Sequence, residues 1–155
     1  MTPSKKIAVV TGASAGIGAV YADRLARRGY DLLLVARRGD RLQELATKLE
    51  QACGIKVETF VADLEKEDDL ARLETVLAGN PAIRVLVNNA GIARLSPVAE
   101  TPMKESLAQI ALNITALTRL THAVLSAFKE RNEGAIINIA SVLAVQTLPV
   151  SSVYS

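Results

Sequence analysis

The sequence predicts an α/β fold in which helices cover both faces of a mostly parallel sheet. Short apolar runs rich in Val, Ile and Leu alternate with segments whose apolar residues recur at the helical period. Glycines follow the first two helical segments, at a position where helices commonly end. Alternation of strands and helices is typical of βαβ units, whose right-handed crossovers bring the carboxyl ends of the strands to one edge.

The predicted elements follow one another along 155 residues, a length that fits a single domain over residues 1–155. We expect strands at residues 7–10, 32–36, 57–61, 85–87 and 135–139. We expect helices at residues 16–28, 41–53, 67–77 and 102–130, the last long enough to contain a break. Ligands of such sheets bind at the carboxyl edge, near the point where the strand order changes direction.

Composition argues against several classes of protein. The net charge of +2 is too small to indicate a nucleic-acid surface. No apolar run reaches the length of a membrane span, and the first residues do not resemble a signal peptide. The single cysteine, Cys53, cannot form an internal disulfide, so we expect a cytoplasmic protein. No cluster of histidines and cysteines predicts a metal site.

A glycine-rich turn joins the first strand to the first helix. It reads TGASAGIG over residues 11–18. Gly12 would permit the tight turn, Gly16 would let a phosphate approach the backbone, and Gly18 would let the helix pack against the strand. A pyrophosphate would then lie against the N–H groups at the start of the helix. A turn without a ligand is the alternative, but the strand–turn–helix context favours phosphate binding.

At this spacing the turn resembles the TGxxxGxG signature of the short-chain dehydrogenase/reductase family. Three further features occur where that family has them: NNAG at residues 88–91, Asn113 in the long helix, and Ser141 followed thirteen residues later by Tyr154. The resemblance extends over essentially the whole chain. It implies a Rossmann-type doubly wound parallel sheet, incomplete at the C-terminus, that binds NAD(P).

The residues after the second strand bear on the choice of cofactor. Relatives that prefer NAD usually have an acidic residue there, which binds the ribose 2′-hydroxyl. This chain has Arg37 and Arg38 and no carboxylate, and arginine suits a 2′-phosphate. We therefore expect NADP, with NAD less favoured. The alternative is that the two arginines only form a solvated loop.

The resemblance also implies the other residues of the cofactor site. Asp63 would contact the adenine ring, with a helix cap as its alternative role. Asn88 would tie strands together, while the rest of the NNAG segment would line the cofactor, unless it is only a turn. The implied cofactor-binding set is Gly12, Ser14, Ala15, Gly16, Ile17, Gly18, Arg37, Arg38, Asp63, Leu64, Asn89, Ala90, Gly91 and Tyr154.

The implied reaction is hydride transfer between the nicotinamide and a carbonyl or secondary alcohol substrate. Tyr154 would be the general acid, and Ser141 would hold the carbonyl oxygen. Asn113 would organise a water or a helix distortion in a proton relay. Taken singly, Ser141 could be a turn cap, Asn113 a kink residue and Tyr154 an ordinary tyrosine; their joint spacing favours catalysis. The apolar segment from Ala144 to Val150 would form one wall of a pocket for a hydrophobic substrate.

The family motif YxxxK places a lysine four residues after the tyrosine, which is beyond Ser155 in this chain. A phenol holds its proton well above neutral pH, and a nearby cation is needed to change that. We therefore expect a C-terminally incomplete chain, inactive in these 155 residues alone, and a homodimer or homotetramer when complete. A non-catalytic module that binds a nucleotide or a partner is the alternative. A methyltransferase with a similar sheet would not explain NNAG or the Ser141–Tyr154 pair.

Overall fold

The computed structural model describes residues 6–146 and 148–155. They form one five-stranded parallel sheet in the order β3-β2-β1-β4-β5. The strands are β1 (Ile7–Thr11), β2 (Asp31–Ala36), β3 (Val57–Val61), β4 (Ile83–Asn88) and β5 (Ala135–Asn138). The predicted α/β class is confirmed. The strand order reverses between β1 and β4, and parallel sheets bind ligands near such a point.

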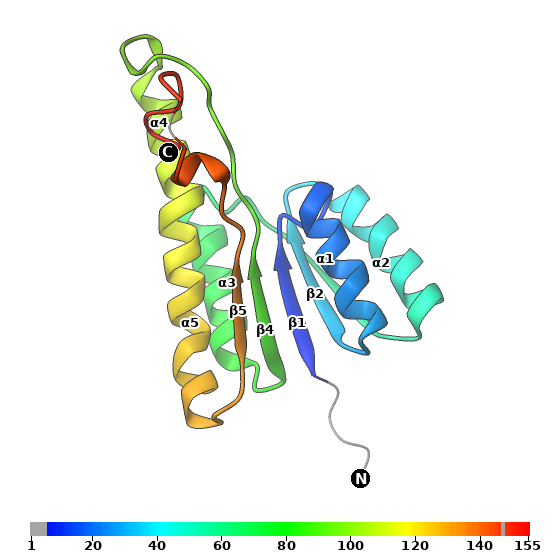
Figure 1. Cartoon of the computed structure of the whole chain (residues 1–155). Coiled ribbons are helices and arrows are strands. Elements are labelled where there is room, and N and C mark those ends of the chain that lie inside the picture. The colour runs from blue at the N-terminus through cyan, green and yellow to red at the C-terminus, as the bar shows by residue number, and fades with distance from the viewer. Residues whose placement is uncertain (1–5, 147) are drawn as a thin grey trace.

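Helices cover both faces of the sheet, as Figure 1 shows. The helix pair α1 and α2 lies on one face, and α3 and α5 lie on the other. The helices are α1 (Gly16–Arg27), α2 (Gly39–Cys53), α3 (Glu67–Gly79), α4 (Met103–Ile110) and α5 (Leu117–Glu130). Three short elements complete the list: η1 (Val98–Glu100), the π-helical turn η2 (Ala111–Ala116) and η3 (Val142–Ala144). The predicted break in the long helix is therefore the π turn between α4 and α5.

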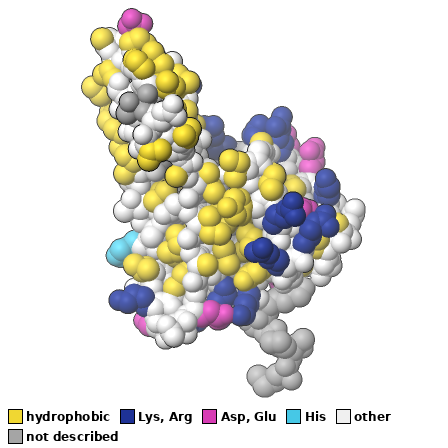
Figure 2. Space-filling view, viewed as in Figure 1, with side chains coloured by type: hydrophobic (Ala, Val, Ile, Leu, Met, Phe, Trp, Pro, Cys, Tyr) yellow, Lys and Arg dark blue, Asp and Glu magenta, His cyan; other side chains and the backbone are white. Residues whose placement is uncertain are grey.

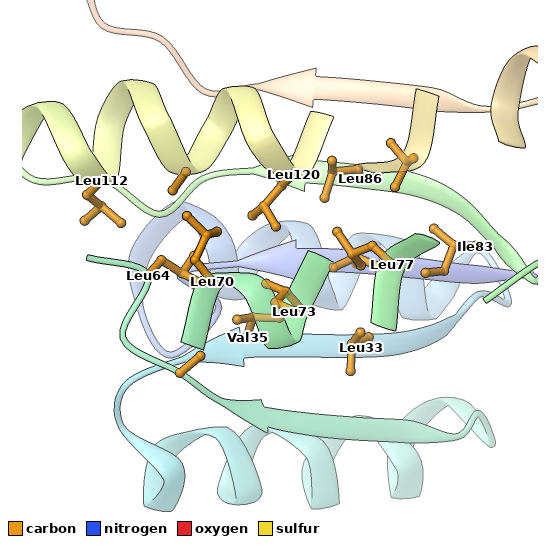
Figure 3. Packing of buried hydrophobic residues seen from close by; sticks show 14 of the residues in the cluster. Leu33, Val35, Leu64, Leu70, Leu73, Leu77, Ile83, Leu86, Leu112 and Leu120 are labelled. Carbon is orange, nitrogen blue, oxygen red and sulfur yellow. The ribbon is translucent and has the colours of Figure 1, made fainter. Parts of the chain in front are cut away.

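Neighbouring residues of each central strand enter opposite cores, as side chains alternate along a strand. In β1, Val9 faces α3 and α5, whereas Ala8 and Val10 face α1 and α2. Figure 3 shows the first of these cores, where Leu33 and Val35 of β2 lie near the leucines of α3. Aliphatic side chains on both faces explain why β1, β2 and β4 read as continuous apolar runs.

Predicted and observed boundaries differ in a few places. α2 begins at Gly39, two residues before the predicted start, and β4 begins at Ile83 rather than Val85. β5 ends at Asn138, so Ile139 lies outside it. Among the described residues, none of the helices combines the length and the apolar composition that crossing a membrane requires.

One part of the molecule projects beyond the sheet, and it carries α4 and the C-terminal segment (Figure 1). Figure 2 shows apolar side chains gathered on its surface. Met103, Leu107 and Val145 are among those exposed, Val145 to 87%. An exposed apolar surface of this kind is typical of regions that a ligand or other protein groups cover.

Candidate active site

The glycine-rich turn lies at the carboxyl end of β1, and its glycines have different structural roles. Gly12 and Gly16 have φ angles of +65° and +56°, in the region that favours glycine. A Cβ atom on Gly18 would lie 2.5 Å from the Gly12 carbonyl oxygen and 2.5 Å from Asn89 Nδ2. The predicted close packing of the first helix at Gly18 is therefore confirmed. A Cβ atom on Gly16 would meet nothing within 4 Å, so the space beside that residue is open.

The start of α1 suits an anion. Ala15 occupies the N-cap position and supplies no side-chain hydrogen bond, and the first turn contains no acidic residue. The N–H groups at a helix start carry partial positive charge, which an anionic group can compensate.

A single buried hydroxyl joins β1 to the NNAG segment. Thr11 Oγ1 donates to the Val87 carbonyl oxygen (3.2 Å) and accepts from the backbone N–H groups of Asn89 and Ala90 (3.0 Å each). Asn89 Nδ2 donates in return to the carbonyl oxygens of Thr11 (2.9 Å) and Gly12 (3.2 Å). Sequence reasoning gave Thr11 no role, because its partners lie more than seventy residues away in the chain.

Asn88 ties strands together, as predicted. Its Nδ2 donates to Asn138 Oδ1 of β5 (2.9 Å) and to Thr121 Oγ1 of α5 (3.0 Å). The NNAG segment is thus fixed on both sides, through Asn89 to β1 and through Asn88 to β5.

A cleft of about 400 Å³, here called the Arg38 cleft, opens at the carboxyl edge beside β1 and β2. The predicted cofactor residues that line it are Gly12, Ser14, Arg37, Arg38, Asp63, Leu64, Ala90 and Gly91. Ile17, Asn89 and Tyr154 line a second cleft instead, and Ala15, Gly16 and Gly18 line neither.

The two arginines after β2 differ in their contacts. Arg38 Nη2 donates to Ser14 Oγ (3.0 Å) and so bridges to the glycine-rich turn. Arg37 Nη1 lies 3.7 Å from Glu65 Oε1, and its side chain is 61% exposed. Arg38 is exposed, as a solvated loop would have it, but it also lines the Arg38 cleft and bonds the glycine-rich turn.

Asp63 follows β3 and does not cap α3. The N-cap of α3 is Lys66, so the alternative that Asp63 caps this helix is wrong. Asp63 Oδ1 instead accepts from the Glu65 backbone N–H (3.3 Å), within the turn that leads to the helix. Asp63 is one of the residues that line the Arg38 cleft.

A second cleft of about 770 Å³, here called the Tyr154 cleft, brings the three predicted catalytic residues together. Ser141 and Tyr154 come from the C-terminal segment, and Asn113 comes from η2. Ser141 Oγ accepts from the Leu143 backbone N–H (3.2 Å), so its alternative as a turn cap is confirmed. An acceptor contact leaves the hydroxyl proton able to donate elsewhere. The cap and a catalytic role are compatible.

Asn113 lies within the π turn, as the predicted helix distortion requires. Its Nδ2 donates to the Ile92 carbonyl oxygen (2.8 Å), and its Oδ1 accepts from the Ile92 N–H (2.9 Å). π turns are rare and occur often at functional sites.

Sequence reasoning also missed Gln109. This side chain is 1% exposed, lines the Tyr154 cleft, and accepts through Oε1 from the Arg94 backbone N–H (2.8 Å). The available signal was a polar residue four positions before Asn113 on an otherwise apolar helix face.

The predicted apolar wall of the pocket is present only in part. Ala144 lines the Tyr154 cleft, but Val145 is directed to solvent. Position 147 lies outside the described residues. Within those residues, no group of three or more His, Cys, Asp or Glu side chains could hold a metal ion.

Comparison with known proteins assigns the family. A family model described as short chain dehydrogenase matches residues 6–155. The chain belongs to the short-chain dehydrogenase family. The very-long-chain 3-oxoacyl-CoA reductase-A of Danio rerio is 36% identical over 154 residues, which cover 97% of this chain and 48% of the relative. The chain thus spans about half the length of the curated relatives it matches.

Solved short-chain dehydrogenases have the same fold. A short-chain dehydrogenase from Sphingobium yanoikuyae in complex with NADPH is 44% identical with a TM-score of 0.93, over 96% of this chain and 59% of the other. A bulky-bulky ketone specific alcohol dehydrogenase from Comamonas testosteroni is 38% identical, also with a TM-score of 0.93, over 96% and 60%. The Rossmann-type sheet is confirmed.

Proposed function

We propose that the full-length protein is an NADP-preferring oxidoreductase that transfers a hydride between the nicotinamide and a carbonyl or secondary alcohol substrate. One observation carries the proposal: the Arg38 cleft and the Tyr154 cleft share the wall formed by Ala90, Gly91 and Ile92. A dinucleotide held in the first cleft would reach the second, where the reacting groups lie. The relative from Sphingobium yanoikuyae, solved with NADPH, supports a nicotinamide cofactor.

The residues of the Arg38 cleft and of the adjoining start of α1 fit this cofactor. The uncapped start of α1 and the open space beside Gly16 suit the pyrophosphate. Asp63 would accept a hydrogen bond from the adenine amino group. Arg38, held by Ser14, supplies a cation for the 2′-phosphate, and this charge-assisted contact is stronger than a hydrogen bond to an uncharged ribose 2′-hydroxyl.

The residues of the Tyr154 cleft would bind and protonate the carbonyl oxygen of the substrate. When bound, the reduced nicotinamide would supply the hydride for the carbonyl carbon. Tyr154 then donates a proton to the oxygen as negative charge develops on it, and the Ser141 hydroxyl holds that oxygen by a hydrogen bond. Asn113 bonds both polar groups of the Ile92 backbone and so holds the helix distortion, while its amide keeps one further donor and one further acceptor position for a water.

We further propose a substrate with an apolar body. Ile110, Ile114, Leu117 and Ala144 contribute apolar side chains to the Tyr154 cleft. According to their names, the two similar proteins reported above act on 3-oxoacyl-CoA and on bulky ketones. Substrates of this kind suit an apolar cleft. A homodimer or homotetramer and a cytoplasmic location remain predictions.

The test combines binding and turnover in the full-length protein. Calorimetric titration with NADPH and with NADH should show binding of both and tighter binding of NADPH. Addition of a panel of ketones to the NADPH complex should then remove the absorbance of the reduced nicotinamide. Binding without turnover would favour the non-catalytic module, and absence of binding would refute the proposal.

A further inference from the structure

Gln109 carries a buried hydrogen-bond donor without a partner in the part of the chain that the structure describes. The residue lies near the end of α4 and is 1% exposed. Its Oε1 accepts from the Arg94 N–H, but its Nε2 has no partner among the described residues. A buried amide donor without an acceptor costs about 1–3 kcal/mol, so such groups usually face a ligand or an ordered water.

The place of this donor in the fold points to a ligand. Gln109 lines the Tyr154 cleft, as do Ser141 and Tyr154. Because the Arg94 N–H donates, it bonds the carbonyl end of the Gln109 amide, and this bond defines which end carries the unpartnered Nε2 donor. A side chain that served only the core at this position would be expected to be apolar, as at the neighbouring Leu112.

The two other unpartnered buried atoms of the described residues have structural surroundings. Asn88 Oδ1 belongs to an amide whose Nδ2 already ties β4 to β5 and α5. Arg131 Nε belongs to a guanidinium group that bonds the Ile83 carbonyl oxygen and stacks on Phe128 at the opposite end of α5. Asn88 also lines the Tyr154 cleft, but its unpartnered atom is an acceptor, so among these three atoms Gln109 Nε2 is the donor that belongs to the cleft lining.

We infer that Gln109 Nε2 donates a hydrogen bond to a second oxygen of the substrate, distinct from the carbonyl oxygen that reacts. This inference rests on the proposed function and narrows the substrate to ketones that carry a further acceptor, such as oxo esters, oxo thioesters and hydroxyketones. A site built to bond an acceptor discriminates against an analogue that lacks it, because its buried donor is then left unpaired.

The test uses two ketones of equal chain length, ethyl 3-oxobutanoate and 2-heptanone, with the full-length protein. The variant Gln109→Met keeps the length of the side chain and removes the amide. We expect kcat/KM for the oxo ester to fall about 10- to 100-fold, and kcat/KM for 2-heptanone to change less than about 3-fold. An equal loss of kcat/KM for both ketones would mean that Gln109 only holds the loop at Arg94. Unchanged kcat/KM values for both would mean that Gln109 does not act in the reaction. Either result would overturn the inference.

A second measurement needs no variant. The dissociation constants of the two ketones, measured calorimetrically in the wild-type complex with NADP⁺, should differ at least about tenfold in favour of the oxo ester. Equal constants would overturn the inference even if Gln109→Met does not fold. If the wild-type protein reduced neither these ketones nor any other in the panel, the proposed function itself would be refuted. Failure of the Gln109 inference and failure of the proposed function are therefore distinguishable.

Discussion

Asn113 holds the backbone of Ile92 at both ends, since its amide donates to the Ile92 carbonyl oxygen and accepts from the Ile92 N–H. The pair connects the π turn of the long helix to the loop that separates the Arg38 cleft from the Tyr154 cleft. Four residues earlier on the same helix, Gln109 accepts from Arg94 of that loop. The Asn113 amide thus fixes the wall that the two clefts share, and the Gln109 amide bonds the same loop two residues further on.

Replacement of Asn113 by leucine should destabilise the protein and weaken cofactor binding. The variant loses two hydrogen bonds of about 1 kcal/mol each, so the free energy of unfolding should fall by about 2 kcal/mol. Urea denaturation measures the change. Thr115→Ala, at an exposed position of the same π turn, is the matched control and should change it by less than about 0.5 kcal/mol. Equal losses in the two variants would contradict the importance of the Ile92 contact.

Thr11→Val should be more damaging than its similar shape suggests. The valine leaves the partly buried N–H groups of Asn89 and Ala90 without their acceptor, at about 1–3 kcal/mol for each unpaired donor. We expect a loss of about 2–4 kcal/mol in the free energy of unfolding. Thr11→Ser keeps the hydroxyl and removes only a methyl group, so it should lose about 1 kcal/mol. A serine variant as unstable as the valine variant would argue against the hydroxyl.

Gly18→Ala tests the close approach of α1 to the glycine-rich turn. The added methyl group would lie 2.5 Å from a backbone oxygen that cannot move freely, so we expect a loss of about 1–3 kcal/mol and weaker NADPH binding. Gly79→Ala is the control, since its added methyl group meets nothing within 4 Å and alanine favours a helix by up to about 1 kcal/mol. Thermal unfolding of both variants should shift in opposite directions. A neutral Gly18→Ala variant would contradict the packing described above.

Cofactor preference should depend on Arg38 more than on Arg37. Arg38 is joined to the glycine-rich turn through Ser14, whereas Arg37 faces Glu65. Loss of a charge-assisted contact to the 2′-phosphate costs about 1.5–3 kcal/mol, so Arg38→Gln should raise the dissociation constant of NADPH about 10- to 100-fold. The constant for NADH should stay the same within experimental error. A parallel loss for both cofactors would show that Arg38 does not read the 2′-phosphate.

The carboxyl group of Glu133 should titrate below its ordinary pKa. Lys6 above all, and also Arg84, bond this carboxylate and lower its pKa from the usual 4.5. A lowered pKa in the folded state means that the contact stabilises the fold above the ordinary pKa and loses this effect as the pH falls through the folded value. Carboxyl carbon NMR titration should show the shift, and Lys6→Gln should reverse most of it. An unchanged titration in that variant would contradict the assignment to Lys6.

The sequence predicted the layers of the fold better than it predicted the contacts of the site. The apolar runs of β1, β2 and β4 are buried on both faces, so their periodicity carried enough information to place them. The glycine-rich turn was found because local backbone geometry restricts the residues there, and NNAG was found through the family resemblance. Thr11, by contrast, acts through groups on another strand, and nothing near it in the chain indicates them.

Contacts between distant residues were equally hard to predict in the long helical region that contains Asn113. Its length suggested a break, and Asn113 suggested a distortion, but the bond pattern with Ile92 joins residues 21 positions apart. Gln109 resembles a surface residue by its type alone and is in fact buried. Polar side chains that bond the backbone of a distant loop are set by tertiary structure, which hydrophobic periodicity does not record.

The most direct test of the proposed chemistry compares the full-length protein with its Tyr154→Phe variant in NADPH-dependent ketone reduction. Removal of the phenolic hydroxyl takes away the proposed proton donor and leaves the rest of the Tyr154 cleft in place. We predict that kcat falls by at least about 100-fold, the lower range for a general acid, while the dissociation constant of NADPH changes less than about 3-fold. A variant that keeps more than about a tenth of the wild-type kcat would contradict the account.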